Sequence, residues 1–139
     1  MSEKTLAIGI DPGTHTGVAV FDLDHRRLLI VDSMPIHAAM DLVEKAHTEG
    51  TLNRVVFEDA RLRTWFGNSG REKLQGAGSI KRDSQIWADF LADLGFPYKA
   101  VKPAAGATKW DAEKFKRFTG WQGRTDEHGR DAALLVWSN

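Results

Sequence analysis

Residues 6–13 have the sequence Leu-Ala-Ile-Gly-Ile-Asp-Pro-Gly. The branched apolar run predicts a short buried β-strand that Pro12-Gly13 stops. Side chains alternate along a strand, so the leucine and isoleucines share one face, and Ala7, Gly9 and Asp11 share the other. Asp11 would then lie at a carboxyl strand end, where ligands gather in open α/β sheets. The local pattern also fits a simple turn that Asp11 begins.

Around this strand, the hydrophobic spacing predicts four further strands and four helices. The strands are expected at 17–22, 28–33, 53–58 and 98–101, and the helices at 35–49, 82–94, 110–118 and 126–138. Three closely spaced strands at the start favour an antiparallel meander. Four glycines and little periodicity favour a mobile loop over 60–79. The order of elements predicts an α/β fold of three layers, with helices flanking a five-stranded mixed sheet.

Length and composition narrow the class of protein. The 139 residues fit one domain, 1–139, because domains most often have about 100–150 residues. An apolar share of 42% is enough for a core. The absence of cysteine excludes disulfides and thiolate metal sites. No apolar stretch approaches the roughly 20 residues that cross a bilayer, and no signal-peptide pattern is present, so we expect a cytoplasmic protein without a membrane anchor.

The formal net charge is zero, but it is unevenly distributed. Residues 1–59 carry five Lys/Arg against ten Asp/Glu, or −5, and residues 60–124 carry thirteen against six, or +7. The last fifteen carry one against three, or −2. A basic middle between acidic ends is compatible with an acidic metal centre inside a basic rim that binds nucleic acid. Ordinary variation in the charge of surface residues along the chain explains the pattern equally well.

Glu58 is a second acidic residue at the end of a predicted strand. Glu58 ends the apolar run Val55-Val56-Phe57, so if the two strands are parallel neighbours, it lies beside Asp11. Two ionised carboxylates that close repel each other unless a cation lies between them. Asp59 points to the opposite face, and we expect it to be a solvated or capping acid.

The third acidic position lies in the last helix. Asp131 precedes Leu134, Leu135 and Ser138 at helical spacing, which predicts that it belongs to the sheet-facing stripe. A carboxylate there is costly to bury unless it is paired or metal-bound. His128 and Glu127 lie one turn earlier on the same side. Stabilisation of the helix dipole is the simpler explanation for an exposed Asp131.

In combination, these motifs resemble those of RuvC-type Holliday junction resolvases. The similar segments are Ala-Ile-Gly-Ile-Asp-Pro-Gly-Thr at 7–14 with Gly-Val-Ala-Val at 17–20, Val-Phe-Glu at 56–58, and His-Gly-Arg-Asp-Ala-Ala at 128–133. Residues 102–109 resemble the basic segment before the family's penultimate helix. The resemblance covers nearly the whole chain, which is short for the family and looks like a compact phage or prophage version. The family usually has two acids at its terminal ligand pair, and here the first is His128.

The resemblance implies an RNase H-like fold and a nuclease that cleaves branched DNA as a homodimer. It implies that Asp11, Glu58, His128 and Asp131 are the catalytic metal ligands, with Glu127 as the substitute for His128. Carboxylates with one imidazole suit Mg²⁺ or Mn²⁺, and two ions about 3.5–4 Å apart are typical of phosphodiester hydrolysis.

Candidate DNA contacts surround these ligands in the basic middle of the chain. Arginines and lysines can contact phosphates, and aromatic rings can stack on bases or wedge them apart. Trp65 and Phe66 could equally anchor their loop to the core. The Trp87/Phe90/Leu91/Leu94 stripe is expected to be core, with a dimer interface as the alternative. The candidates for DNA contact are Arg61, Arg63, Trp65, Phe66, Arg71, Lys73, Lys102 and Lys109.

Three alternatives stay open from the sequence. A YqgF-like RNA-processing nuclease shares the opening segment, but its Asp-Glu-Arg motif is not found in the later part of this sequence. A sugar-kinase or actin-like ATPase shares the Gly-Thr turn but needs two lobes to enclose ATP. A non-catalytic module that binds branched DNA would have the same fold.

Overall fold

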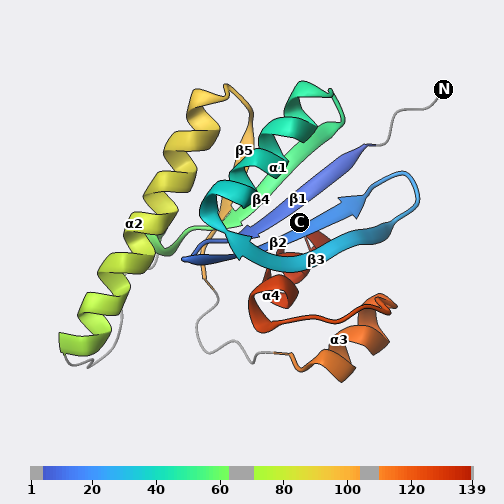
Figure 1. Cartoon of the computed structure of the whole chain (residues 1–139). Coiled ribbons are helices and arrows are strands. Elements are labelled where there is room, and N and C mark those ends of the chain that lie inside the picture. Colours follow the sequence, from blue (N-terminus) through green and yellow to red (C-terminus); the bar gives the residue numbers. More distant parts are fainter. Residues whose placement is uncertain (1–4, 63–70, 104–109, 139) are drawn as a thin grey trace.

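The computed structural model describes residues 5–62, 71–103 and 110–138. For residues 71–77 within this set, it describes the backbone alone. Figure 1 shows the arrangement of the elements. The strands are β1 (Leu6–Asp11), β2 (His15–Asp22), β3 (Arg27–Pro35), β4 (Leu52–Glu58) and β5 (Tyr98–Val101). The helices are α1 (Ile36–Thr48), the short 3₁₀ helix η1 (Ala60–Leu62), α2 (Arg71–Asp93), α3 (Ala112–Thr119) and α4 (Glu127–Ser138). The predicted order of strands and helices is therefore confirmed.

The five strands form one mixed sheet in the order β3-β2-β1-β4-β5. β1 pairs with β2 antiparallel and β2 with β3 antiparallel, which confirms the predicted meander. β1 pairs with β4 parallel and β4 with β5 parallel. The first strand of the chain is thus the central strand, and its carboxyl end lies beside that of β4.

Helices cover both faces of the sheet, with α1 and α2 on one side and α3 and α4 on the other (Figure 1). Ile8 and Ile10 pack with α1 and α2, while Ala7 packs with α3 and α4, so the predicted alternation along β1 is confirmed. Among the described residues, no helix is both long and apolar enough to span a bilayer.

The second helix corrects the prediction for residues 60–79. α2 begins at Arg71 rather than near residue 82, so the helix is longer than expected. The sequence of its first turns carries little apolar periodicity, which is why the hydrophobic pattern did not reveal them. Trp87 and Leu91 are fully buried, with Phe90 and Leu94 packed against the same cluster. The predicted core role of this stripe is confirmed.

The last helix also differs from expectation. Its buried face consists of Gly129, Ala132, Ala133 and Val136, whereas Asp131 is half-buried beside that face. The inward stripe predicted through Leu134, Leu135 and Ser138 was therefore wrong. The physical reason is close packing, because small residues let the helix lie nearer to the sheet than leucines would.

Two glycines of the sheet make this close approach possible. A side-chain carbon added at Gly9 on β1 would overlap the backbone carbonyl oxygen of Ala132, and one added at Gly17 on β2 would overlap that of His128. Both obstacles are backbone atoms, so no side-chain rotation could relieve the overlap. The sheet glycines consequently determine where α4, and with it His128, is held.

Candidate metal centre

The candidate ligands lie along one row that crosses the sheet. Asp11 pairs with Gly17 on β2, and Gly17 pairs with Ser33 on β3. In the other direction Ile10 pairs with Phe57, so Glu58, the last residue of β4, lies at the level of Asp11. The row thus presents one carboxylate from each of the two central parallel strands, as the strand ends predicted.

Helix α4 adds the remaining two side chains to this row. The Nδ1 atom of His128 lies 3.1 Å from Oδ2 of Asp11, across 117 positions of sequence. Asp131, one turn further along α4, is close enough for its charge to act on Asp11. The structure therefore brings Asp11, Glu58, His128 and Asp131 together from β1, β4 and α4.

Electrostatics at Asp11 reflect this crowding of acids. Only 13% of its side chain is exposed, against 52% for His128. Burial and, to a lesser extent, the negative charges of Glu58 and Asp131 together raise the pKa of Asp11 from 3.8 to about 6, against the lowering effect of the hydrogen bond from His128. A cation between these carboxylates would favour their ionised forms.

The four side chains fit a divalent metal in chemical kind. Three carboxylates and an imidazole are suitable ligands for Mg²⁺ or Mn²⁺. Within residues 5–62, 71–103 and 110–138, however, no three His, Asp or Glu side chains converge tightly enough to hold an ion as they stand. Because the like charges repel and His128 engages Asp11, the side chains would have to close in around an ion.

The raised pKa gives a prediction for the metal-free protein. The folded chain binds the Asp11 proton more tightly than the unfolded chain, so stability falls as the pH rises from 3.8 through 6. Asp11→Asn removes this loss. In EDTA, we expect the variant to exceed wild type in free energy of unfolding by at most about 3 kcal/mol at pH 8, and to match it near pH 4. Urea denaturation at both pH values measures the difference. A variant less stable than wild type at pH 8 would contradict the assigned cause.

Asp59, the residue after Glu58, was expected to be a solvated or capping acid. It is not solvated, but it does cap η1, since its Oδ1 accepts from the backbone N–H of Arg61 at 3.0 Å. Its side chain is almost fully buried and accepts hydrogen bonds from Arg61 Nε at 2.9 Å and from Arg61 Nη2 at 2.7 Å. These bonds hold the pKa of Asp59 below its ordinary value. A buried carboxylate needs such a partner, because an unpaired one is costly.

The same contacts change the interpretation of Arg61. Its third guanidinium nitrogen, Nη1, donates to Gln85 of α2 at 2.7 Å. Arg61 therefore joins the end of β4 to α2. About a third of its side chain, 32%, is exposed, and its contact with DNA stays a prediction.

The other predicted DNA contacts are only partly described. Lys102 is exposed and directly follows Val101, which pairs with Glu58 across β4 and β5. It thus lies next to the carboxylate row. Arg71 and Lys73 belong to the first turn of α2, where only the backbone is described. Arg63, Trp65, Phe66 and Lys109 lie outside the described residues.

Sequence reasoning missed the residues that seat α4 on the sheet. Asp126 precedes the helix and accepts a hydrogen bond from the backbone N–H of Gly129 at 2.7 Å, as an N-cap residue does. Its second carboxylate oxygen accepts from the hydroxyl of Ser33 on β3. The cap could have been recognised from an acid three residues before Gly129, but nothing local to Ser33 indicated its partner.

Comparisons with known proteins identify the fold. No protein-family model matches the chain, and no curated protein matches it significantly. Among solved structures, RuvC of T. thermophilus in complex with a Holliday junction substrate is similar, with a TM-score of 0.61 and 20% sequence identity. The alignment covers 96% of this chain and 92% of that one. The predicted RNase H-like fold, with a mixed five-stranded sheet between helices, is confirmed by this similarity.

Proposed function

We propose that this chain is a metal-dependent endonuclease that cleaves branched DNA, with four-way junctions as its substrate class. The observation that carries the proposal is the meeting of Asp11, Glu58, His128 and Asp131 at one end of the central strands. The similarity of the fold to a protein solved with a Holliday junction supports it.

The reaction would be hydrolysis of a phosphodiester bond. Two Mg²⁺ or Mn²⁺ ions, when bound, would supply activation of water and stabilisation of the leaving oxygen. Asp11 occupies the centre of the row, and its carboxylate would hold the ions together with those of Glu58 and Asp131. Glu58 and Asp131 flank it from β4 and α4, and the His128 ring holds the Asp11 carboxylate through its hydrogen bond. Ionised Asp11 is required, so cleavage should increase as the pH rises through the ionisation of this carboxyl.

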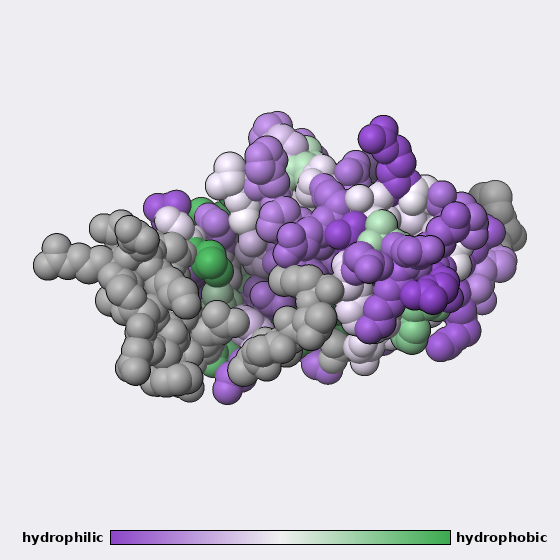
Figure 2. Space-filling view, turned by 90° about the horizontal axis from the view of Figure 1, so that it is seen from below, coloured by the Kyte–Doolittle hydropathy of each residue, from purple (hydrophilic) through white to green (hydrophobic). Residues whose placement is uncertain are grey.

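The face of the molecule on which α3 and α4 lie is largely hydrophilic (Figure 2). Figure 2 shows the molecule from below, the side on which α3 and α4 lie in Figure 1, and hydrophilic residues dominate this face outside the grey atoms.

A junction has two equivalent strands to cut, so we also propose a homodimer with twofold symmetry.

A cleavage assay with defined substrates tests the proposed function. The protein is incubated with a four-way DNA junction, a DNA flap and an RNA duplex, each with Mg²⁺, with Mn²⁺ or with EDTA. We expect metal-dependent cleavage of the junction. Cleavage of RNA alone would favour an RNA-processing nuclease instead, and junction binding without any cleavage would favour a non-catalytic module.

Lys102 gives a prediction for binding. If it contacts a phosphate, junction affinity should fall less steeply with salt in Lys102→Ala, because fewer counterions are released. We expect the slope of log affinity against log salt to decrease by about 0.9. Fluorescence anisotropy in EDTA measures it. An unchanged slope would mean that Lys102 does not touch the backbone.

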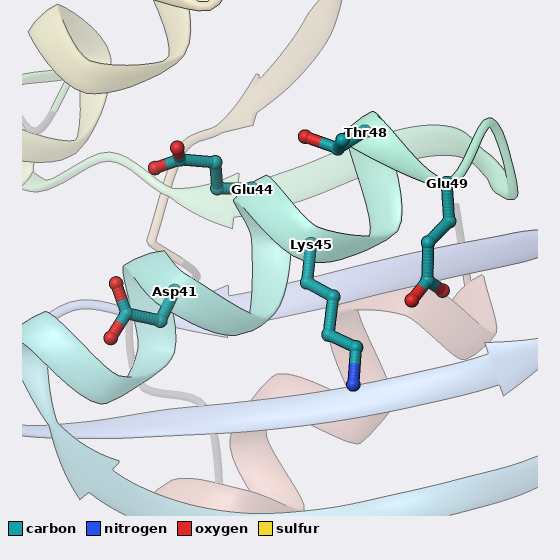
Figure 3. A pocket seen from close by; sticks show the side chains of 5 residues that line it. All are labelled: Asp41, Glu44, Lys45, Thr48 and Glu49. Atoms are coloured by element: carbon teal, nitrogen blue, oxygen red, sulfur yellow. The ribbon is translucent and has the colours of Figure 1, made fainter.

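The matched control for this experiment is Lys45→Ala. Lys45 is an exposed residue of α1, on the opposite face of the sheet from α4. Figure 3 shows it among Asp41, Glu44 and Glu49, where the surrounding acids would repel a phosphate. The variant removes the same charge, and its salt slope should equal that of wild type.

A further inference from the structure

The first turn of α4 is attached to the sheet at a point that none of the four candidate ligands occupies. One oxygen of Asp126 caps the helix by accepting from the N–H of Gly129, and the other accepts from the hydroxyl of Ser33 on β3. The contact is close packed, since a side-chain carbon at Gly129 would lie 3.0 Å from the backbone nitrogen of Asp32. Asp126 thus performs two separable tasks, capping the helix and linking it to β3.

This attachment lies in the same cross-strand row as the candidate ligands. Ser33 pairs with Gly17, and Gly17 pairs with Asp11, so Ser33 is two strands away from Asp11 at the same level. The first turn of α4 crosses this row. Asp126 contacts Ser33, the carbonyl of His128 packs over Gly17, and the His128 ring reaches Asp11.

The row limits how the helix can move. The backbone contact at Gly17 prevents α4 from moving closer to the sheet. It does not prevent the helix from moving away from the sheet or from rotating about its own axis. The Ser33–Asp126 hydrogen bond opposes both movements. Because His128 and Asp131 belong to the same helix, a turn of α4 would displace both of them from Asp11 together.

We propose that Ser33 and Asp126 are positioning residues of the metal centre, because their hydrogen bond holds His128 and Asp131 toward Asp11. This inference rests on the proposed function, since it assumes that these residues bind metal. Neither Ser33 nor Asp126 is one of the candidate metal ligands. Groups that orient metal ligands in this way typically change metal affinity or activity by about 10–100-fold.

The test measures Mn²⁺ affinity of the full-length chain by isothermal titration calorimetry, alongside junction cleavage. Ser33→Ala removes the link and leaves the cap in place. We expect its Mn²⁺ affinity to fall by about 10–100-fold. Ser33→Thr keeps a hydroxyl and should restore affinity to within a few fold of wild type. Asp126→Ser keeps a capping side chain that is too short to reach β3, so it should resemble Ser33→Ala.

Asp111→Ala is the matched control, because Asp111 caps α3 by accepting from the N–H of Lys114. It removes a comparable cap away from the carboxylate row and should leave Mn²⁺ affinity unchanged. Wild-type affinity in both Ser33→Ala and Asp126→Ser would overturn the inference, as would an equal loss in Asp111→Ala. If wild type itself neither binds Mn²⁺ nor cleaves the junction, the proposed function fails instead.

Discussion

Asp11→Asn, Glu58→Gln and Asp131→Asn are each expected to reduce junction cleavage by roughly 10³–10⁶-fold, the range seen when central catalytic groups are removed. Each substitution removes one negative charge with little change of shape. A neutral amide is a poor ligand for Mg²⁺, so the affected ion would be lost or displaced. Single-turnover cleavage of a labelled four-way junction measures the effect.

Junction binding should survive these substitutions, and it should tighten where repulsion between carboxylate and phosphate is relieved. His128→Asp should have a smaller effect, with a shift from Mn²⁺ toward Mg²⁺, because an oxygen ligand replaces nitrogen. If all three carboxamide variants cleave normally, the row is not a catalytic metal centre.

Asp41→Asn is the appropriate charge-matched control for this series. Asp41 is exposed on α1, on the opposite face of the sheet from α4 (Figure 3), so its variant should cleave like wild type. Asp59 is next to Glu58 but unsuitable, because it forms the buried ion pair with Arg61. Loss of that pair would lower stability and obscure any effect on catalysis.

Gly17→Ala is expected to lower both stability and cleavage. The added methyl group would overlap the backbone carbonyl of His128, and neither backbone can yield without moving α4 or β2. Overpacking of this kind costs about 1–3 kcal/mol, and occasionally more. Because the displaced segment carries His128, we expect cleavage to fall by at least about 10²-fold, as small misplacements of catalytic groups can. Urea denaturation and the cleavage assay measure the two effects.

Gly78→Ala separates this steric effect from the general consequence of replacing a glycine. Gly78 lies within α2 and has open space where the methyl group would be placed. Alanine there should stabilise the helix by about 1 kcal/mol and leave cleavage unchanged. Wild-type stability and cleavage in Gly17→Ala would show that α4 is not held by this contact.

Much of the fold could be predicted from local patterns. The alternating apolar run up to Asp11, and the stop at Pro12-Gly13, identified the central strand and its carboxyl end. The same reasoning located Glu58 at the end of β4. Strand periodicity and turn residues act over a few positions, so the sequence displays them directly.

Side chains at the ends of adjacent parallel strands become neighbours whatever the intervening sequence contains. The meeting of Asp11 and Glu58 was therefore predictable once β1 and β4 had been recognised as parallel strands. Asp131 had been placed on an inward stripe of α4 that was wrong, so its assignment, like that of His128, depended on the resemblance.

The tertiary structure alone decided how α4 is seated and which charges are already paired. Ser33 and Asp126 are 93 positions apart, and their contact depends on the pairing of β1, β2 and β3 in one register. Arg61 donates hydrogen bonds to Asp59 and to Gln85, which is 24 positions away. A residue of the basic segment 60–124 therefore helps to hold the fold together. Such contacts follow from how close backbones approach in three dimensions. Gly9, Gly17 and Gly129 determine that approach, and the linear pattern of apolar and charged residues does not encode it.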